Sequence, residues 1–169
     1  MYSTDGDFGK VRLIKKPLDI YGNNGFEVPF CLKGAGWHRC NSLYKISRNT
    51  GINKQMLLFS VTDGGAFCIG NGSEVQIPAS SAVFLPAFQP HTYYAVPGKI
   101  WEFYWFDTEA HGNPYFTDLF SGNLVMNLSN IKQISYEFER MLNNQITSEQ
   151  KFMVESSQMI SNIYHALLY

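Results

Sequence analysis

Between residues 26 and 108 the chain carries short hydrophobic segments separated by glycine-rich turns. Residues 55–62 (QMLLFSVT) are almost continuously apolar, whereas residues 74–77 alternate polar and apolar positions, which is the period of a β-strand. Gly70-Asn71-Gly72 tolerates positive φ and predicts a β-hairpin. Short strands at this spacing predict an antiparallel β-sandwich or β-barrel. The expected strands are 26–33, 43–47, 55–62, 66–69, 74–77, 82–85 and 101–106.

Beyond residue 118 the period changes from two to that of a helix, and two helices are expected. The first has apolar residues at Ile131, Ile134, Phe138, Met141 and Leu142. The second carries two neighbouring apolar stripes, which are Phe152, Met159, Ile163 and Ala166, and Met153, Ile160, Tyr164 and Leu167. So wide an apolar surface must bury more than one face. Both stripes could pack on the chain's own barrel, or one could pair with a second copy. We expect the second copy, with dimer contacts at Met153, Ile160, Ile163, Tyr164 and Leu167.

These patterns predict a mainly β fold with C-terminal helices in three parts. Residues 1–17 are polar and interrupted by glycines, which predicts an N-terminal arm. Residues 18–120 are expected to form a ligand-binding antiparallel barrel of the jelly-roll type. Residues 121–169 are expected to form a helical dimerisation segment.

Composition and charge exclude several classes of function. With 169 residues, 45% hydrophobic and 16% charged, the chain is expected to form one compact domain. A net charge of −1 gives no basic field for nucleic acid, and no recognition helix is apparent. The sequence has neither a signal peptide nor an apolar run of about 20 residues, so we expect a cytoplasmic protein without a membrane partner. Cys31, Cys40 and Cys68 show no CxxC spacing and are expected to be reduced thiols.

The aromatic segment 83–108 (VFLPAFQPHTYYAVPGKIWEFYWFDT) is the most distinctive part of the chain. A strand over its second half places Trp101, Phe103 and Trp105 on one face and Glu102, Tyr104 and Phe106 on the other. Three large rings on one face form either a bulky core or the lining of a small-molecule pocket. A second polar-aromatic cluster, Trp37-His38-Arg39, could enter the pocket mouth or lie at an exposed strand end.

The motif LPAFQPHTY followed by WEFYWF is similar to the loop and strand that close a cupin barrel. Metal-dependent cupins carry two histidines one residue apart, a glutamate and a further histidine, which together hold a metal. Here His91 stands alone, and the other three histidines lie far away in sequence. We therefore expect no metal site, no cofactor and no catalytic residues, and we expect that the chain is not an enzyme.

The order of features resembles the N-terminal sensor and dimerisation domain of AraC-type transcription regulators. The features are LLFSVTDGGAF, the hairpin IGNGSEVQI, the block FLPAFQPHTYYAVPGKIWEFYWF and then two helices. The resemblance implies a cupin-like barrel that binds a small-molecule effector, a homodimer, and DNA contact only through a C-terminal helix-turn-helix domain absent from this chain. It also implies ligand contacts at Arg48, Tyr93 and Trp105. Phe103 stands where the arabinose-responsive member has a polar histidine, so a different ligand is expected.

The chemistry of these residues fits a carbohydrate. A tryptophan plane can cover the C–H face of a sugar, while arginine and tyrosine bond its hydroxyls. The expected ligand-binding set is Arg48, Tyr93, Trp105, His91, Trp101 and Phe103. Three functions stay open at this point. They are a sugar sensor, a metal-dependent cupin enzyme such as an isomerase or oxygenase, and an interaction module with a solid core.

Overall fold

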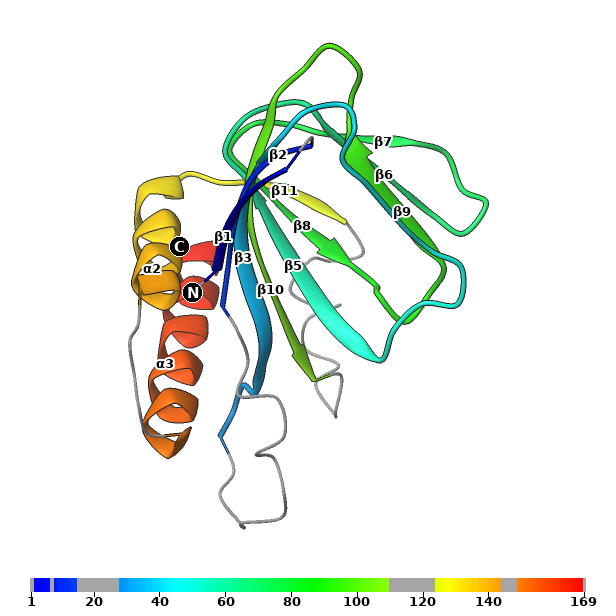
Figure 1. Cartoon of the computed structure of the whole chain (residues 1–169). Helices are drawn as coiled ribbons and strands as arrows, with labels where there is room; N and C mark the ends of the chain where they lie inside the picture. Colours follow the sequence, from blue (N-terminus) through cyan, green and yellow to red (C-terminus); the bar gives the residue numbers. More distant parts are fainter. Residues whose placement is uncertain (1, 7, 15–27, 110–123, 144–148, 169) are drawn as a thin grey trace.

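The computed structural model contains two antiparallel β-sheets packed face to face, with two helices on the outer side of the larger sheet (Figure 1). It describes residues 2–6, 8–14, 28–109, 124–143 and 149–168. The expected fold class is confirmed as a mainly antiparallel β-sandwich with two C-terminal helices.

The larger sheet has seven strands and the smaller has four. In spatial order the larger sheet contains β1 (Tyr2–Gly6), β2 (Gly9–Leu13), β3 (Leu32–Cys40), β10 (Trp101–Glu109), β5 (Lys54–Ser60), β8 (Ser81–Leu85) and β11 (Val125–Asn127). The smaller sheet contains β4 (Lys45–Arg48), β9 (His91–Ala95), β6 (Gly65–Ile69) and β7 (Val75–Ile77). The predicted hairpin is confirmed, because β6 and β7 pair on either side of Gly70, whose φ is 54°.

The central strand β10 confirms the period-two prediction. Trp101 and Phe103 are buried in the core between the two sheets, and Trp105 packs against the same core. Tyr104 and Phe106 belong to a second core, which lies between the larger sheet and the helices. Because successive side chains of a strand point to opposite faces, β10 contributes large rings to both cores.

Helices α2 (Ile131–Asn143) and α3 (Glu149–Leu168) confirm the change of period after residue 118. Phe138 of α2 is fully buried, and its ring centroid lies 5.0 Å from Phe59, 5.1 Å from Tyr104 and 5.8 Å from Phe106. Burying one such side chain contributes about 1.5–3 kcal/mol. These contacts attach the helices to the outer face of the larger sheet. Among the described residues, no helix is long and apolar enough to cross a membrane.

The residues expected at a dimer contact are instead part of the chain's own core. Ile160 and Ile163 have no exposed surface, and Met153 and Tyr164 are 9% and 8% exposed. Leu167 is partly buried and packs against the hydrophobic cluster formed by the larger sheet, α2 and α3. The wide apolar surface of α3 is therefore filled by its own sheet and by α2. This corrects the residue assignment, because these side chains offer a second chain little surface.

Strand β3 corrects a second expectation. The sequence predicts a strand over residues 26–33, of which 26 and 27 lie outside the described residues, whereas the strand runs from Leu32 to Cys40. Gly34 and Gly36 lower the strand propensity of this segment, yet both pair with β10. Residues 2–6 and 9–13 of the predicted arm form β1 and β2, which extend the larger sheet beyond β3.

Candidate functional site

The indole of Trp105 lies over two glycines of the neighbouring strand β3. A Cβ added to Gly36 would lie 2.7 Å from Trp105 Nε1, and one added to Gly34 would lie 3.3 Å from the Cη2 and Cζ3 atoms of the same ring. Only glycine at both positions lets the ring approach this closely. Trp105 stays half-buried, so its side chain still has surface for a ligand.

Trp101 and Phe103, by contrast, are packing residues. Both have no exposed surface, and their rings stack with centroids 3.9 Å apart. The Trp101 Nε1–H donates to Ser60 Oγ at 2.8 Å. A ligand would have to displace this packing to reach either ring, so the structure does not place them with the accessible site candidates.

His38 is a buried polar residue that is not among the ligand-binding residues expected from the sequence. Its side chain points from β3 into the core between the sheets, where it lies 5.0 Å from the Phe103 ring, 5.2 Å from Tyr44 and 6.1 Å from Trp105. It is 8% exposed, and neither ring nitrogen has a hydrogen-bond partner. Burial lowers the pKa of His38 to about 4, so the ring is neutral at pH 7 and offers one N–H donor and one acceptor.

Asp107 supplies a second unpaired buried atom on the same face. Its Oδ2 accepts a hydrogen bond from Lys54 Nζ at 2.7 Å, whereas its Oδ1 is buried with no partner. In the register of β3 and β10, Phe103 pairs with His38 and Asp107 pairs with Gly34, so Trp105 lies between the two polar groups. Buried polar atoms without partners are uncommon and costly, which marks this stretch as a binding candidate.

Arg48, Tyr93 and His91, three residues of the expected ligand-binding set, lie close together on the smaller sheet. Arg48 Nη1 lies 3.3 Å from His91 Nε2, and His91 Nδ1 lies 2.8 Å from the Gln89 carbonyl oxygen. Because arginine only donates, His91 accepts at Nε2 and donates from Nδ1, which fixes the neutral tautomer. Burial lowers the pKa of His91. Burial raises the pKa of Tyr93, against the opposing effects of Arg48 and of a hydrogen bond from Tyr44.

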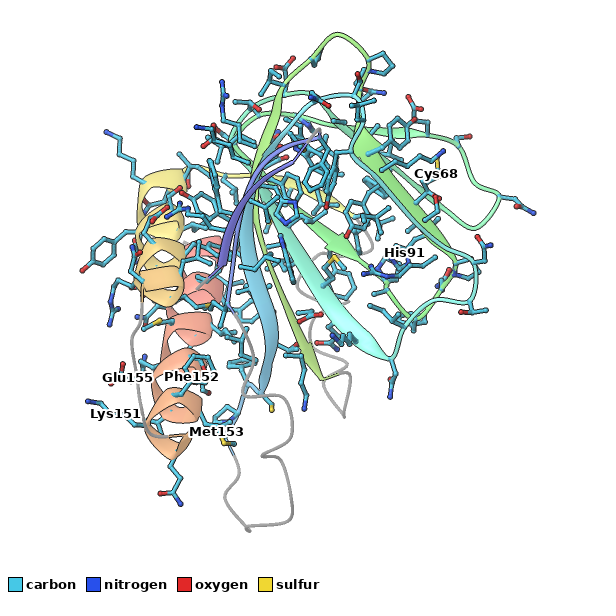
Figure 2. All side chains as sticks on the ribbon, in the orientation of Figure 1. Cys68, His91, Lys151, Phe152, Met153 and Glu155 are labelled. Atoms are coloured by element: carbon cyan, nitrogen blue, oxygen red, sulfur yellow. The ribbon has the colours of Figure 1, made fainter. Side chains whose placement is uncertain are left out.

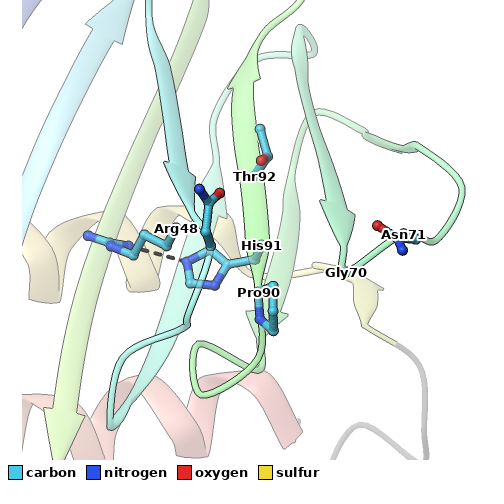
Figure 3. A pocket seen from close by; sticks show the side chains of 7 residues that line it. Arg48, Gly70, Asn71, Pro90, His91 and Thr92 are labelled. Carbon is cyan, nitrogen blue, oxygen red and sulfur yellow. Dashed lines mark hydrogen bonds between the residues drawn. The ribbon is translucent and has the colours of Figure 1, made fainter.

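A pocket of about 350 Å³ opens where β4 ends and β9 begins (Figure 3). Its lining residues are Arg48, Asn49, Gly70, Asn71, Pro90, His91 and Thr92. A dashed line joins the side chains of Arg48 and His91, and Asn71 lies at the β6–β7 turn. His91 is far from Phe152 and Met153 of α3, which lie on the opposite side of the larger sheet (Figure 2). The candidate site thus belongs to the sandwich and not to the helices.

The described residues do not assemble a metal centre. Within the ranges 28–109, 124–143 and 149–168, no three His, Cys, Asp or Glu side chains are grouped so that they could hold a metal ion. His38, His91 and Asp107 are therefore considered as hydrogen-bonding groups.

The buried His38 predicts a loss of stability in mild acid. In the unfolded chain its pKa is near 6.5, and in the folded chain it is about 4. Between these values the unfolded state binds more protons, so the free energy of unfolding falls as the pH falls and stops falling below about pH 4. From pH 7 to pH 5 we expect this group alone to remove about 2 kcal/mol. Urea unfolding at both pH values measures the loss.

The matched variants are His38→Phe and His165→Phe, the latter at an exposed histidine of α3. His38→Phe should abolish this part of the pH dependence, because phenylalanine does not titrate and suits the aromatic surroundings. His165→Phe should retain it. An unchanged pH dependence in His38→Phe would contradict the burial of a neutral His38.

No protein-family model and no curated protein matches the sequence. The chain does have solved structural neighbours of the cupin fold. The plu4264 protein of Photorhabdus luminescens matches with a TM-score of 0.43 and 15% identity, over 73% of this chain and 90% of that one. A mutant of Bacillus subtilis oxalate decarboxylase matches with a TM-score of 0.44 and 10% identity, over 75% and 39%.

A Vibrio cholerae transcriptional regulator of the HTH_3 family matches with a TM-score of 0.38 and 9% identity, over 44% of this chain and 42% of that one. This chain thus spans less than half of both the decarboxylase and the regulator. Neighbours of this fold include enzymes as well as regulators. At these identities the likeness concerns the fold alone.

Proposed function

We propose that the chain senses a small molecule bound on Trp105 between the two sheets. The observation that carries this proposal is the pair of unpaired buried groups, the His38 ring and Asp107 Oδ1, on either side of an indole with accessible surface. A bound molecule with hydroxyl groups would supply the donors and acceptors that these groups lack. The chain uses no metal, no cofactor and no catalytic residue in this role.

A carbohydrate is the proposed class of ligand. The C–H face of a sugar ring suits the indole plane, which the glycines at 34 and 36 hold flat against β3. A neutral imidazole donates and accepts, as does a sugar hydroxyl, so His38 matches that partner better than it matches a lone cation or anion. Tyr93 and Arg48 add further polar contacts from the smaller sheet.

The sensor is proposed to belong to an AraC-type transcriptional regulator that acts in the cytoplasm as a homodimer. The aromatic block and the order of barrel and helices support this assignment. Contact with DNA would then come from a helix-turn-helix domain outside this chain. With the inner stripes of α3 occupied by the core, the homodimer would use outward side chains of the helices, of which Tyr136, Val154 and Leu168 are large, apolar and exposed.

The test compares Trp105→Ala with the parent in thermal unfolding against L-arabinose, D-glucose, D-galactose and maltose. We expect at least one sugar to stabilise the parent, by about 2.7 kcal/mol at a concentration 100 times its Kd. Trp105→Ala should remain folded and lose that response, because the sugar loses its stacking plane. Circular dichroism checks the fold.

Trp37→Ala is the control, since Trp37 of β3 is also half-buried but packs on the helix side of the larger sheet. It removes an indole without touching the space between the sheets, so the response to sugar should persist. A full response in Trp105→Ala, or a parent that none of these sugars stabilises, would contradict the proposal.

A further inference from the structure

We infer that the pocket at the ends of β4 and β9 receives an anionic group of the ligand, a carboxylate or a phosphate. This rests on the proposed function and adds the charge of the bound molecule. The pocket holds about 350 Å³ and, among its lining residues, contains one guanidinium, two amides and no acidic side chain. Its volume is enough for a charged substituent together with part of the ring that carries it.

The charge of Arg48 is not neutralised by an acidic side chain of the described residues. Lys54 is paired with Asp107 at 2.7 Å, and Arg140 is paired with Glu137 at 2.8 Å. Within the described parts of the chain, no acidic side chain forms an ion pair with Arg48. A half-buried arginine without a carboxylate is uncommon, because its charge has lost part of its hydration and gained no counter-charge.

The neighbours of Arg48 are neutral hydrogen-bonding groups. Its contacts are the neutral Nε2 of His91, at 3.3 Å, and the Tyr93 hydroxyl. The His91 ring is held in place by its own hydrogen bond to the Gln89 carbonyl oxygen at 2.8 Å. These two acceptors orient the guanidinium but leave its positive charge and several of its five N–H donors for a ligand. A planar fork of this kind binds the paired oxygens of carboxylates and phosphates.

The rest of the pocket wall adds hydrogen-bond donors. Asn49 and Asn71 are exposed and can donate amide N–H groups to an oxygen anion. Asn71 belongs to the β6–β7 turn and lines the same pocket as Arg48 and His91 (Figure 3). The anionic group of a bound ligand would contact donors from two turns. The ring of the same ligand would then reach toward the space between the sheets.

Isothermal titration of the parent with D-glucose, D-glucuronate and D-glucose 6-phosphate tests the inference, with inorganic phosphate and acetate as isolated anions. We expect one charged sugar to bind at least tenfold more tightly than glucose, and we expect raising NaCl from about 50 to about 500 mM to weaken that binding. The glucuronate and phosphate arms distinguish a carboxylate from a phosphate. Arg48→Met should remove the preference for the charged sugar.

Two further variants make the result specific to Arg48. Lys45→Met removes the same charge from an exposed position on the same strand, and it should keep the preference. Arg48→Lys keeps the charge but not the fork, so it should bind the charged sugar more weakly and still prefer it to glucose. If Arg48→Met does not fold, Arg48→Lys and the dependence on NaCl decide the question.

The outcomes separate the two proposals. The anionic site is overturned if the charged sugars bind no more tightly than glucose, or if Arg48→Met still prefers a charged sugar to glucose. Neither result contradicts the sensor proposal. Binding of inorganic phosphate alone that is lost in Arg48→Met supports the anionic site without the sugar. Failure of all five probes to bind overturns the anionic site, whereas the sensor proposal is overturned only if none of the four neutral sugars stabilises the parent in thermal unfolding.

Discussion

Replacement of Ile160 by aspartate is expected to unfold the chain, not to release folded monomers. Ile160 has no exposed surface and lies in the core between the larger sheet and the helices. An unpaired carboxylate there loses its hydration and gains no partner, so we expect the free energy of unfolding to fall by about 4 kcal/mol or more. That is a large share of the roughly 5–15 kcal/mol that stabilises a domain. Urea unfolding followed by circular dichroism measures the loss.

Gln158→Asp is the matched control on the same helix, because Gln158 is exposed and is not one of the apolar side chains proposed for the dimer. Its effect on the stability of the chain should stay within about 0.5 kcal/mol. Sedimentation of both variants and of the parent shows whether each protein is monomeric or dimeric, and urea unfolding shows how stable its fold is. A folded, monomeric Ile160→Asp beside a dimeric parent would contradict the placement of Ile160 in the core.

Gly65→Ala is expected to destabilise the sandwich by about 3 kcal/mol, the upper part of the range for overpacked cores. A Cβ on Gly65 would lie 2.3 Å from Trp101 Cε2 and 2.6 Å from Cζ2. The indole cannot retreat, because it has no exposed surface, stacks on Phe103 and donates to Ser60 Oγ. Thermal unfolding gives the loss, and near-ultraviolet circular dichroism reports the displaced indole.

Gly98→Ala serves as the comparison for Gly65→Ala. A Cβ at Gly98 meets nothing within 4 Å, although its φ of 80° is unfavourable for alanine. Backbone strain alone should cost about 1–2 kcal/mol. If Gly65→Ala were no more destabilising than Gly98→Ala, the contact between β6 and Trp101 would be looser than described.

The elements with a strong period could be predicted from the sequence, and those shaped by a distant contact could not. The two faces of β10 and both helices follow from alternation and from helical spacing. Strand β3 was misplaced because Gly34 and Gly36 have low strand propensity. Their presence is explained by the Trp105 ring, which is about 70 residues away in sequence and needs the space of two missing side chains.

The candidate site shows the same division. Arg48 and His91, two members of the expected ligand-binding set, line one pocket. Period two assigns Trp101, Phe103 and Trp105 to one face, but it does not tell how deeply each ring is buried along that face. The unpaired atoms of His38 and Asp107 depend on the register of β3 against β10, which no local pattern reveals.

The apolar surface of α3 illustrates a further limit. Two apolar stripes predict that two surfaces cover the helix, but the residue pattern is the same whether those surfaces belong to one chain or to two. Here the larger sheet and α2 provide them. Only the three-dimensional arrangement decides between the two possibilities.

The double burial of β10 restricts how this protein can change during evolution. An insertion or deletion of one residue within the strand would turn Trp105 toward the helices and Tyr104 toward the other sheet, which would disrupt both cores together. Point substitutions at single inward positions avoid this penalty, and the β6–β7 turn beside Arg48 can change length outside the paired strands. New ligand preferences should therefore arise by side-chain replacement on β10 and by length variation in that turn.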